Sequence, residues 1–275
     1  NRNDSFCGKF SLCNNLKQTG IPFSIGAKHV LDPEGEEFAN EINWFLGVCH
    51  VINGLRNVRI GSIGARTPDF RTVRFSEKIL ERNGISVETV DLSQILAVAG
   101  GLKDSDPEVS KRIAELGAYC VNQEGVPKEA ITKNAKLSLA VERWLTERDV
   151  SAFALQCWPA LQKSYGIYPC TFMSFLTERF FPSACETDVM GALSMYALQL
   201  ASGTPSALFD INNNYGDDPE KMILFHCSNC PTSFMNRVST SFNAMAVKGD
   251  GLENSFAVFR GILKPGRITF ARIMT

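Results

Sequence analysis

The sequence predicts an α/β protein with a parallel sheet, followed by a smaller part built from antiparallel strands. Residues 57–90 have the pattern strand, loop, helix, glycine and strand, which is a βαβ unit and implies parallel pairing. Residues 149–157 form an apolar run typical of a strand buried on both faces. From Met222 onward the apolar runs are short and separated by turns, as in antiparallel sheets. We therefore expect an α/β domain at 1–204 and a β-rich domain at 205–275.

Along the chain, the first 18 residues are polar and weakly patterned, and they predict no regular element. Pro33 opens an amphipathic segment that runs to about Leu55, with apolar residues at helical spacing. Acidic residues cluster at its start, where the helix dipole favours them. Within the βαβ unit, we expect strands at 58–63 and 85–90 and a helix at 70–83.

The elements after the βαβ unit alternate between helices and strands until the β-rich part begins. They are helices ending at Leu116, within 127–146, at 171–180 and at 192–200, and strands at 149–157, 205–210 and 256–260, with an Asn-rich loop at 212–218. Because the helices lie between strands, they are expected to cover the faces of the parallel sheet.

Composition limits the classes of protein that this chain can belong to. It has 275 residues, of which 44% are hydrophobic and 21% charged, so it can bury a large core. A net charge of -1 gives no electrostatic reason to expect a nucleic acid or an anionic membrane as partner. No uninterrupted apolar run reaches the ~18 residues of a membrane span, and no secretory signal is recognisable.

The nine cysteines are an odd number, scattered over a chain of ordinary domain size. This distribution fits reduced thiols in the cytosol better than a disulfide framework, so we expect a cytoplasmic protein. The sequence begins with Asn1 and not with Met, so we expect it to be a fragment of a longer protein.

Two carboxylates and a histidine in the second half of the chain suggest a divalent-metal site. Glu186 stands just ahead of a helix-like apolar run, Asp210 follows the next turn, and His226 ends another apolar stretch. Carboxylate oxygens and imidazole nitrogens are ligands of such cations. Asp188 lies only two residues beyond Glu186, so on a helix the two would not share a face. We interpret Asp188 as a cap or a supporting group.

The end of the predicted central strand is a second candidate region. Gln156 and Trp158 lie there, and ligands of parallel α/β sheets gather at the carboxyl ends of the strands. Both side chains could line a pocket, and packing of Trp158 under a loop is the alternative. Arg66 and Asp69 follow the first strand at the same edge, where a structural role or ligand contact is open for Arg66.

Several of these residues stand in a pattern that extends from about Phe38 to Ala271. The pattern consists of Ile60–Phe70 with Arg74–Lys78, Gln156–Trp158, Ala184–Asp188 with Gly191–Met195, Asp210 and His226. It resembles the L-fucose isomerase / L-arabinose isomerase superfamily, with the Cys-Glu-x-Asp-x-x-Gly-Ala-Leu stretch as the most specific part. The resemblance implies a Rossmann-like parallel-sheet domain followed by a C-terminal antiparallel β-barrel-like domain.

The resemblance also implies an activity, the interconversion of open-chain aldoses and ketoses at a Mn²⁺-preferring site. Glu186 and Asp210 would be the catalytic carboxylates and would hold Mn²⁺ or another divalent cation together with His226. A carboxylate can move a proton between C1 and C2 of a sugar through a cis-enediol, whose enediolate form carries a negative charge that a cation stabilises. Gln156, Trp158 and Asn212 would contact the sugar.

The third metal ligand and the extent of the protein follow from the same resemblance. Arabinose-isomerase-like members have a ligand-type histidine soon after the second carboxylate, as His226 is here, whereas fucose-isomerase-like members take theirs from further toward the C-terminus. Members of the superfamily are longer at both ends and form trimers or hexamers. We therefore expect a homo-oligomer for the intact protein. The alternative is a non-catalytic sugar-binding relative or an inactive fragment of such an isomerase.

The neighbouring motif His226-Cys227-Ser-Asn-Cys230 offers two further hypotheses. A structural zinc site normally has four ligands, and no second cysteine pair stands at suitable spacing. A redox dithiol requires the pair at the start of a helix, but Pro231 follows it here. Two buried thiols near the site are the simplest interpretation.

Overall fold

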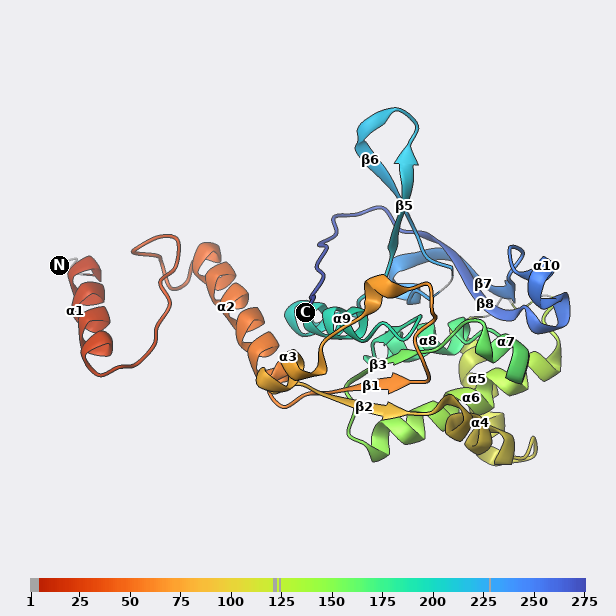
Figure 1. Cartoon of the computed structure of the whole chain (residues 1–275). Coiled ribbons are helices and arrows are strands. Elements are labelled where there is room, and N and C mark those ends of the chain that lie inside the picture. The colour runs from red at the N-terminus through yellow and green to blue at the C-terminus, as the bar shows by residue number, and fades with distance from the viewer. Residues whose placement is uncertain (1–4, 121–122, 124, 228) are drawn as a thin grey trace. The chain divides into compact units, whose positions relative to one another are not determined.

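A computed structural model describes residues 5–120, 123, 125–227 and 229–275 (Figure 1). The chain divides into two compact units, Asn1–Ile52 and Asn53–Thr275. Helix α1 (Ser5–Gln18) lies in a stretch for which the sequence predicted no element, and α2 (Glu36–Leu55) matches the predicted amphipathic helix. Neither helix has a buried residue. The predicted domain boundary at residue 204 stays a prediction.

The second unit is built on a parallel sheet of four strands in the order β2-β1-β3-β4. These strands are β1 (Arg59–Ile63), β2 (Ser86–Val90), β3 (Ala152–Leu155) and β4 (Ser183–Ala184). In register, Ile60 lies between Val87 on one side and Ala152 on the other. The predicted βαβ unit and the predicted central strand are therefore confirmed, and so is the α/β class.

Two hydrophobic clusters cover the two faces of this sheet, because successive side chains of a strand point to opposite sides. On β3, Phe153 and Leu155 belong to one cluster, and Ala152 and Ala154 to the other. The small alanines allow α9 to approach β3 closely. Burying one large apolar side chain such as Phe153 contributes roughly 1.5–3 kcal/mol, so the sheet holds the positions of its strand ends firmly.

The helices around the sheet largely confirm the predicted pattern. They are α3 (Glu77–Arg82), α4 (Leu92–Gly101), α5 (Pro107–Tyr119), α6 (Lys128–Glu147), α7 (Ala160–Tyr165), α8 (Cys170–Glu178) and α9 (Val189–Ser202). The predicted helix at 70–83 is shorter, since it begins as a 3-10 turn at Arg71–Val73 and becomes α-helical only at Glu77. Among the described residues, no helix is long and apolar enough to cross a membrane.

The last part of the chain forms two antiparallel pairs of strands. They are β5 (Asp210–Tyr215) with β6 (Asp218–Phe225), and β7 (Met235–Phe242) with β8 (Phe256–Leu263), with the short helix α10 (Val247–Asp250) between the last two. The β7–β8 pair packs on α8, where the Thr171 hydroxyl donates to the Ala257 carbonyl over 2.8 Å. The antiparallel character is confirmed, in the form of two separate two-stranded sheets.

Two of the predicted elements in this region are wrong. The expected strand at 205–210 has no regular structure before Asp210, and the expected Asn-rich loop forms most of β5. The asparagines pair with the apolar strand β6, as in the register of Asn213 with Ile223 and of Asn214 with Met222. All six residues of β5 are exposed, so pairing with β6 and not burial defines this strand.

Candidate functional site

The carboxyl ends of β1, β3 and β4 lie side by side, and the loops that follow them are joined by hydrogen bonds. The Ala65 backbone N–H after β1 donates to Gln156 Oε1 after β3 over 2.9 Å. The Thr187 hydroxyl after β4 donates to the Ala65 carbonyl over 3.1 Å. The chain leaves β1 toward β2 on one side, while β3 lies on the other side of β1, which makes this edge a topological switch point. Ligands of open α/β sheets bind at such points.

Glu186 follows β4 in an unusual backbone conformation. Glu186 and Thr187 have φ angles of 56° and 57°, in the left-handed region that favours glycine. Each such residue costs roughly 1–3 kcal/mol, and conformations of this kind persist where surrounding contacts fix them. Here the Thr187 N–H donates to the Leu155 carbonyl over 3.1 Å. The sharp turn therefore has a definite orientation at the end of the sheet.

Helix α9 begins directly after this turn, and Asp188 anchors its first residues. The Asp188 carboxylate accepts a hydrogen bond from the Gly191 N–H over 2.8 Å and is the N-cap of α9. The Arg272 guanidinium donates to both of its oxygens, over 2.5 and 2.9 Å. Of the two roles proposed for Asp188, a cap or a supporting group, the structure confirms the cap.

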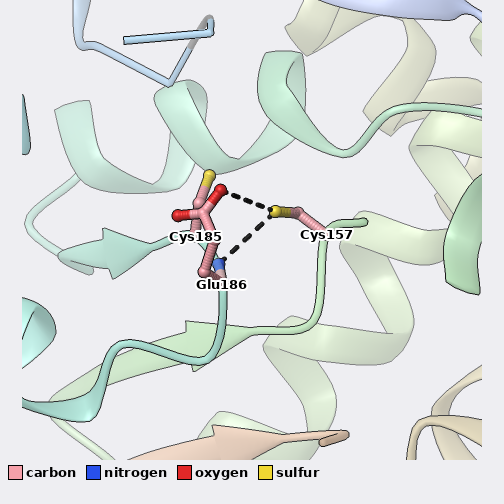
Figure 2. Close-up of side chains that lie close together, drawn as sticks. All are labelled: Cys157, Cys185 and Glu186. Atoms are coloured by element: carbon pink, nitrogen blue, oxygen red, sulfur yellow. Dashed lines mark hydrogen bonds between the residues drawn. The ribbon is translucent and has the colours of Figure 1, made fainter. Parts of the chain in front are cut away.

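Two cysteine thiols lie next to the Glu186 carboxylate (Figure 2). The Cys157 thiol donates to Glu186 Oε1 over 3.5 Å, and the Glu186 backbone N–H donates to Cys157 Sγ over 3.4 Å. The sulfur atoms of Cys157 and Cys185 and a carboxylate oxygen of Glu186 all lie within 4.8 Å of one another. Cys157 and Cys185 are buried, so Glu186 is the polar end of a largely enclosed group.

A second group of possible ligand atoms also contains Glu186. Its carboxylate, the His226 imidazole and the Cys227 thiol lie within 4.8 Å of one another. The hairpin β5–β6 ends at this place, since Phe225 pairs with Asp210 and His226 follows directly. His226 Nδ1 accepts a hydrogen bond from the Asn229 N–H over 3.2 Å, which orients the ring. Two parts of the chain that are distant in sequence thus meet at Glu186.

The environment raises the pKa of Glu186 to about 7. Burial of the carboxyl is the largest cause, His226 opposes it, and Cys227 and Asp210 add to it. A carboxyl group with a pKa near neutrality can take up and release a proton at neutral pH, as a general acid or base must. Glu186 therefore has the ionisation expected of a proton carrier.

The pKa values of the thiols around Glu186 are shifted in opposite directions. A hydrogen bond from Cys185 lowers the pKa of Cys157, but burial and the Glu186 charge outweigh it, and the net shift is upward. The hydrogen bond with Cys157 and burial raise the pKa of Cys185. Hydrogen bonds from Cys170 and Cys185 lower the pKa of Cys227, and the His226 charge acts in the same direction. Cys227 is therefore the thiol of this group most prepared to ionise.

The other predicted site residues lie at varying distances from this centre. Asp210 is exposed and belongs to neither group of ligand atoms in the described part of the chain, although its charge acts on Glu186. Gln156 holds the loop after β1, and Trp158 is 40% exposed at the same edge. Asn212 lies on the exposed strand β5. The structure thus brings Glu186 and His226 together, with Asp210 as an electrostatic neighbour.

Cys157 and Cys185 are not among the functional residues predicted from the sequence. Both lie close to the end of a strand: Cys157 is two residues after Leu155, the last residue of β3, and Cys185 immediately follows β4. A two-residue strand such as Ser183–Ala184 has no recognisable pattern in sequence, so the approach of Cys185 to Cys157 could not be predicted. The position of Cys157 at the end of the predicted central strand was the available signal.

The donor atoms around Glu186 fit a divalent cation. Carboxylate and imidazole suit Mn²⁺, and the neighbouring thiols suit softer cations. Asp210 offers a further carboxylate at the end of the same hairpin as His226. The arrangement can therefore hold a cation beside a carboxyl group that exchanges protons.

Comparisons with known proteins relate the chain to one group of sugar isomerases. The family model described as "Fucose/sulfoquinovose isomerase, N-terminal domain" matches residues 1–56. Proteins named sulfoquinovose isomerase from Priestia aryabhattai and Priestia megaterium are 25% identical over 274 residues, which is 99% of this chain and 59% of each relative. One from a Clostridium species is 24% identical over 237 residues, 84% of this chain and 51% of the relative.

These matches confirm the resemblance to the fucose isomerase-like superfamily. The chain spans about 59% of the length of the Priestia relatives. Residues 1–56, which include α1 and all of α2, are similar to the N-terminal domain of that family.

Proposed function

We propose that this chain carries catalytic groups of an aldose–ketose isomerase that acts on an open-chain sugar. The observation that supports this most is the position of Glu186. Its carboxyl group has a pKa of about 7 and lies within 4.8 Å of His226 and Cys227, at the edge of the sheet where ligands bind. The relatives named sulfoquinovose isomerase support the same reaction type.

In the proposed reaction, the Glu186 carboxylate takes the proton from C2 of the aldose. Asp210, in its protonated form, donates a proton to C1, and the proton of the C2 hydroxyl moves to the C1 oxygen, so that a ketose results through a cis-enediol. Glu186 then releases its proton to solvent and Asp210 takes one up, which restores both groups. Glu186, Asp210 and His226 would hold Mn²⁺ or another divalent cation, which when bound polarises the sugar carbonyl and offsets the developing negative charge. Proton transfer by a positioned carboxylate typically contributes 10²–10⁴-fold to the rate.

For the substrate, we propose sulfoquinovose first, because the relatives carry that name. L-Fucose and arabinose, which the sequence resemblance suggested, are the alternatives. Gln156, Trp158 and Asn212 are proposed to contact the sugar; Gln156 and Trp158 lie at the same edge of the sheet as Glu186, and Asn212 lies on the hairpin that ends at His226. Which sugar is accepted depends on the shape of the pocket around C3 to C6.

For the whole protein, we propose a cytoplasmic homo-oligomer, a trimer or hexamer, in which the antiparallel strands belong to a β-barrel-like domain. The two antiparallel pairs β5–β6 and β7–β8 are the support for such a domain in this chain. Light scattering of the full-length protein, measured after size-exclusion chromatography, tests the oligomeric state. A monomer at micromolar concentration would remove this part of the proposal.

The decisive experiment is a turnover assay with the full-length protein, with this chain alone measured in parallel. Each sample is incubated with Mn²⁺ and with sulfoquinovose, L-fucose, L-arabinose or D-arabinose, and the ketose is quantified by NMR. We expect ketose from at least one sugar and incorporation of deuterium from D₂O at C1, because the proton passes through a carboxyl group that exchanges with solvent. Sugar binding without any turnover by the full-length protein would instead identify a non-catalytic sugar-binding relative.

A further inference from the structure

We propose that Cys157, Cys185 and Glu186 form a binding site for a thiophilic divalent cation such as Zn²⁺, with Cys227 as a further donor in the neighbouring group that shares Glu186. This site goes beyond the proposed isomerase function and does not depend on it. It consists of Cys157 and the adjacent residues Cys185 and Glu186, which the fold brings to one point (Figure 2).

The spacing of the donor atoms is close to what a tetrahedral ion requires. The two sulfur atoms and the carboxylate oxygen lie within 4.8 Å of one another, and Cys157 Sγ is 3.5 Å from Glu186 Oε1. With Zn–S bonds of about 2.3 Å and Zn–O bonds of about 2.0–2.2 Å, the edges of a zinc tetrahedron measure roughly 3.5–3.8 Å. Binding therefore requires contraction of the group by no more than about an ångström.

The backbone holds these donors in place before any ion arrives. Strands β3 and β4 pair in parallel, with Phe153 opposite Ser183 and Ala154 opposite Ala184. Cys185 follows β4 directly, and the Glu186 N–H donates to Cys157 Sγ. Because both cysteines are buried at fixed strand ends, little side-chain entropy remains to be lost on binding.

A fourth donor is available at the more open side of the group. The Cys227 thiol lies in the same group of ligand atoms as Glu186 and His226, all within 4.8 Å of one another. Cys227 is only partly buried, so an ion can enter from this side. The two thiolates and the carboxylate of the proposed site already favour Zn²⁺ or another soft cation over Mn²⁺.

The proposed site differs from the Cys-x-x-Cys hypothesis that the sequence alone suggested. Cys230 is buried in another hydrophobic cluster, together with Tyr168 and Phe259, and belongs to neither group of ligand atoms in the described part of the chain. Its thiol donates to the Pro231 carbonyl over 3.8 Å. Of the two cysteines in that motif, only Cys227 lies in a group of ligand atoms that contains Glu186, among the described residues.

Glu186 is common to the thiol group and to the group with His226. A soft cation held by Cys157, Cys185 and Glu186 would therefore compete with Mn²⁺ for the same carboxylate. This consequence rests on the proposed function, whereas the site itself can be tested without any sugar.

The test uses Co²⁺ as a spectroscopic probe for the zinc site, added to the intact, reduced protein. We expect a near-ultraviolet thiolate-to-cobalt charge-transfer band and the visible bands of a tetrahedral ion, both displaced by one equivalent of Zn²⁺. Cys157→Ala and Cys185→Ala should each weaken Co²⁺ binding tenfold or more. Cys230→Ala is the matched control, because it removes a buried thiol outside the site, and it should leave the spectrum unchanged.

A second measurement needs no variant and therefore does not depend on whether the alanine variants fold. X-ray absorption of the zinc-loaded protein should show two or three sulfur neighbours at about 2.3 Å. A first shell of nitrogen and oxygen alone would overturn the proposal, as would the absence of a charge-transfer band from the intact protein. Retention of the band in folded Cys157→Ala and Cys185→Ala variants, with unchanged Co²⁺ affinity, would also overturn it. A protein that shows the band but no isomerase turnover would count only against the isomerase function.

Discussion

Glu186 is the residue at which the strained turn, the raised pKa and both groups of ligand atoms coincide. Burial away from water disfavours the ionised form of this carboxyl group, and the nearby His226 charge partly offsets that effect. The result is a group poised between its two protonation states near neutral pH. Such tuning is characteristic of residues that transfer protons.

For the proposed isomerase, Glu186→Gln should lower kcat by about 10²–10⁴-fold, since the amide cannot accept the C2 proton. The amide has the same size as the carboxylic acid, so the fold should persist with an unchanged circular dichroism spectrum. Turnover of the full-length protein is measured with saturating sugar and Mn²⁺. Glu129→Gln is the matched control, because Glu129 forms a surface ion pair with Lys133 on α6, and its kcat should equal that of the unchanged protein.

An unchanged kcat in Glu186→Gln would remove Glu186 from the reaction. The outcome is informative even with reduced metal affinity, because kcat and the dependence of the rate on Mn²⁺ concentration are measured separately.

At the residue scale, the sequence allowed Glu186 and His226 to be proposed as neighbours, and the structure places their ligand atoms within 4.8 Å. The sequence did not reveal that Cys157 and Cys185 lie there too. That approach depends on the register between β3 and a strand of only two residues, Ser183–Ala184. Register is a tertiary property, and so short a strand carries no periodic pattern from which to infer it.

At the scale of single elements, a glycine at the C-terminal end of a helix and a glycine within a helix differ in what their backbone requires. Gly203 ends α9 with a φ of 68°, and a Cβ added there would meet no atom within 4 Å. Gly100 lies within α4, and a Cβ there would also meet no atom within 4 Å. The two positions differ in backbone conformation and not in available space.

We therefore expect opposite effects of the same substitution on the free energy of unfolding. Gly203→Ala should destabilise the protein by about 1 kcal/mol, because a left-handed conformation is unfavourable for alanine. Gly100→Ala should stabilise it by roughly 0.5–1 kcal/mol, because alanine loses less conformational entropy in a helix. Urea denaturation followed by circular dichroism measures both. Equal signs for the two variants would contradict the assigned helix end.

The N-terminus of α4 gives a pH-dependent prediction. The Asp91 carboxylate accepts a hydrogen bond from the Ser93 N–H over 2.7 Å, and the hydrogen bonds to Ser93 lower the pKa of Asp91 below its ordinary value of 3.8. Its contribution to stability is therefore fully present above pH ~4 and is lost as the pH falls through the lowered pKa. NMR titration of the Asp91 carboxyl should give a midpoint below 3.8.

Asp91→Asn is the control for this prediction, because asparagine keeps the capping oxygen and lacks the titrating group. The variant should lose part of the acid dependence of stability while α4 remains folded. A titration midpoint for Asp91 at or above its ordinary value would contradict the cap.

The elements that could be predicted from sequence are those with a strong repeating pattern. Helices such as α2 and α6 and strands such as β1 and β2 follow from apolar periodicity and flanking glycines. The strand β5 was missed because three of its six residues are asparagines and all six are exposed. Its structure comes from pairing with β6, which sequence propensity does not report.

At the scale of the whole molecule, the hydrophobic clusters of the described residues all lie in the second unit. The first unit has helices without buried residues, and large apolar side chains such as Phe10 and Trp44 are 62% and 67% exposed. Stability of the chain should thus reside almost entirely in the second unit.

Removal of residues 1–52 should leave the melting temperature unchanged within a few degrees, because no cluster loses a buried side chain. Removal of residues 264–275 is the matched truncation at the other end. It deletes Arg272 and leaves the Asp188 carboxylate, whose side chain is only 6% exposed, without its ion pair. An unpaired buried group costs about 1–3 kcal/mol, which corresponds to a fall in melting temperature of roughly 2–10 °C.

Differential scanning calorimetry measures both truncated chains. A large loss of stability on removing residues 1–52, or none on removing residues 264–275, would contradict this division of the molecule.

The left-handed pair Glu186–Thr187 has a consequence for directed evolution of this protein. Each of the two residues would relax if replaced by glycine, which adopts the same φ without strain. Selection of a library at these two positions for thermal resistance should enrich glycine, whereas selection for turnover should retain glutamate at position 186. The two selections favour different residues at position 186. Sequencing both surviving pools would therefore show whether the position of this carboxyl group lowers the stability of the protein.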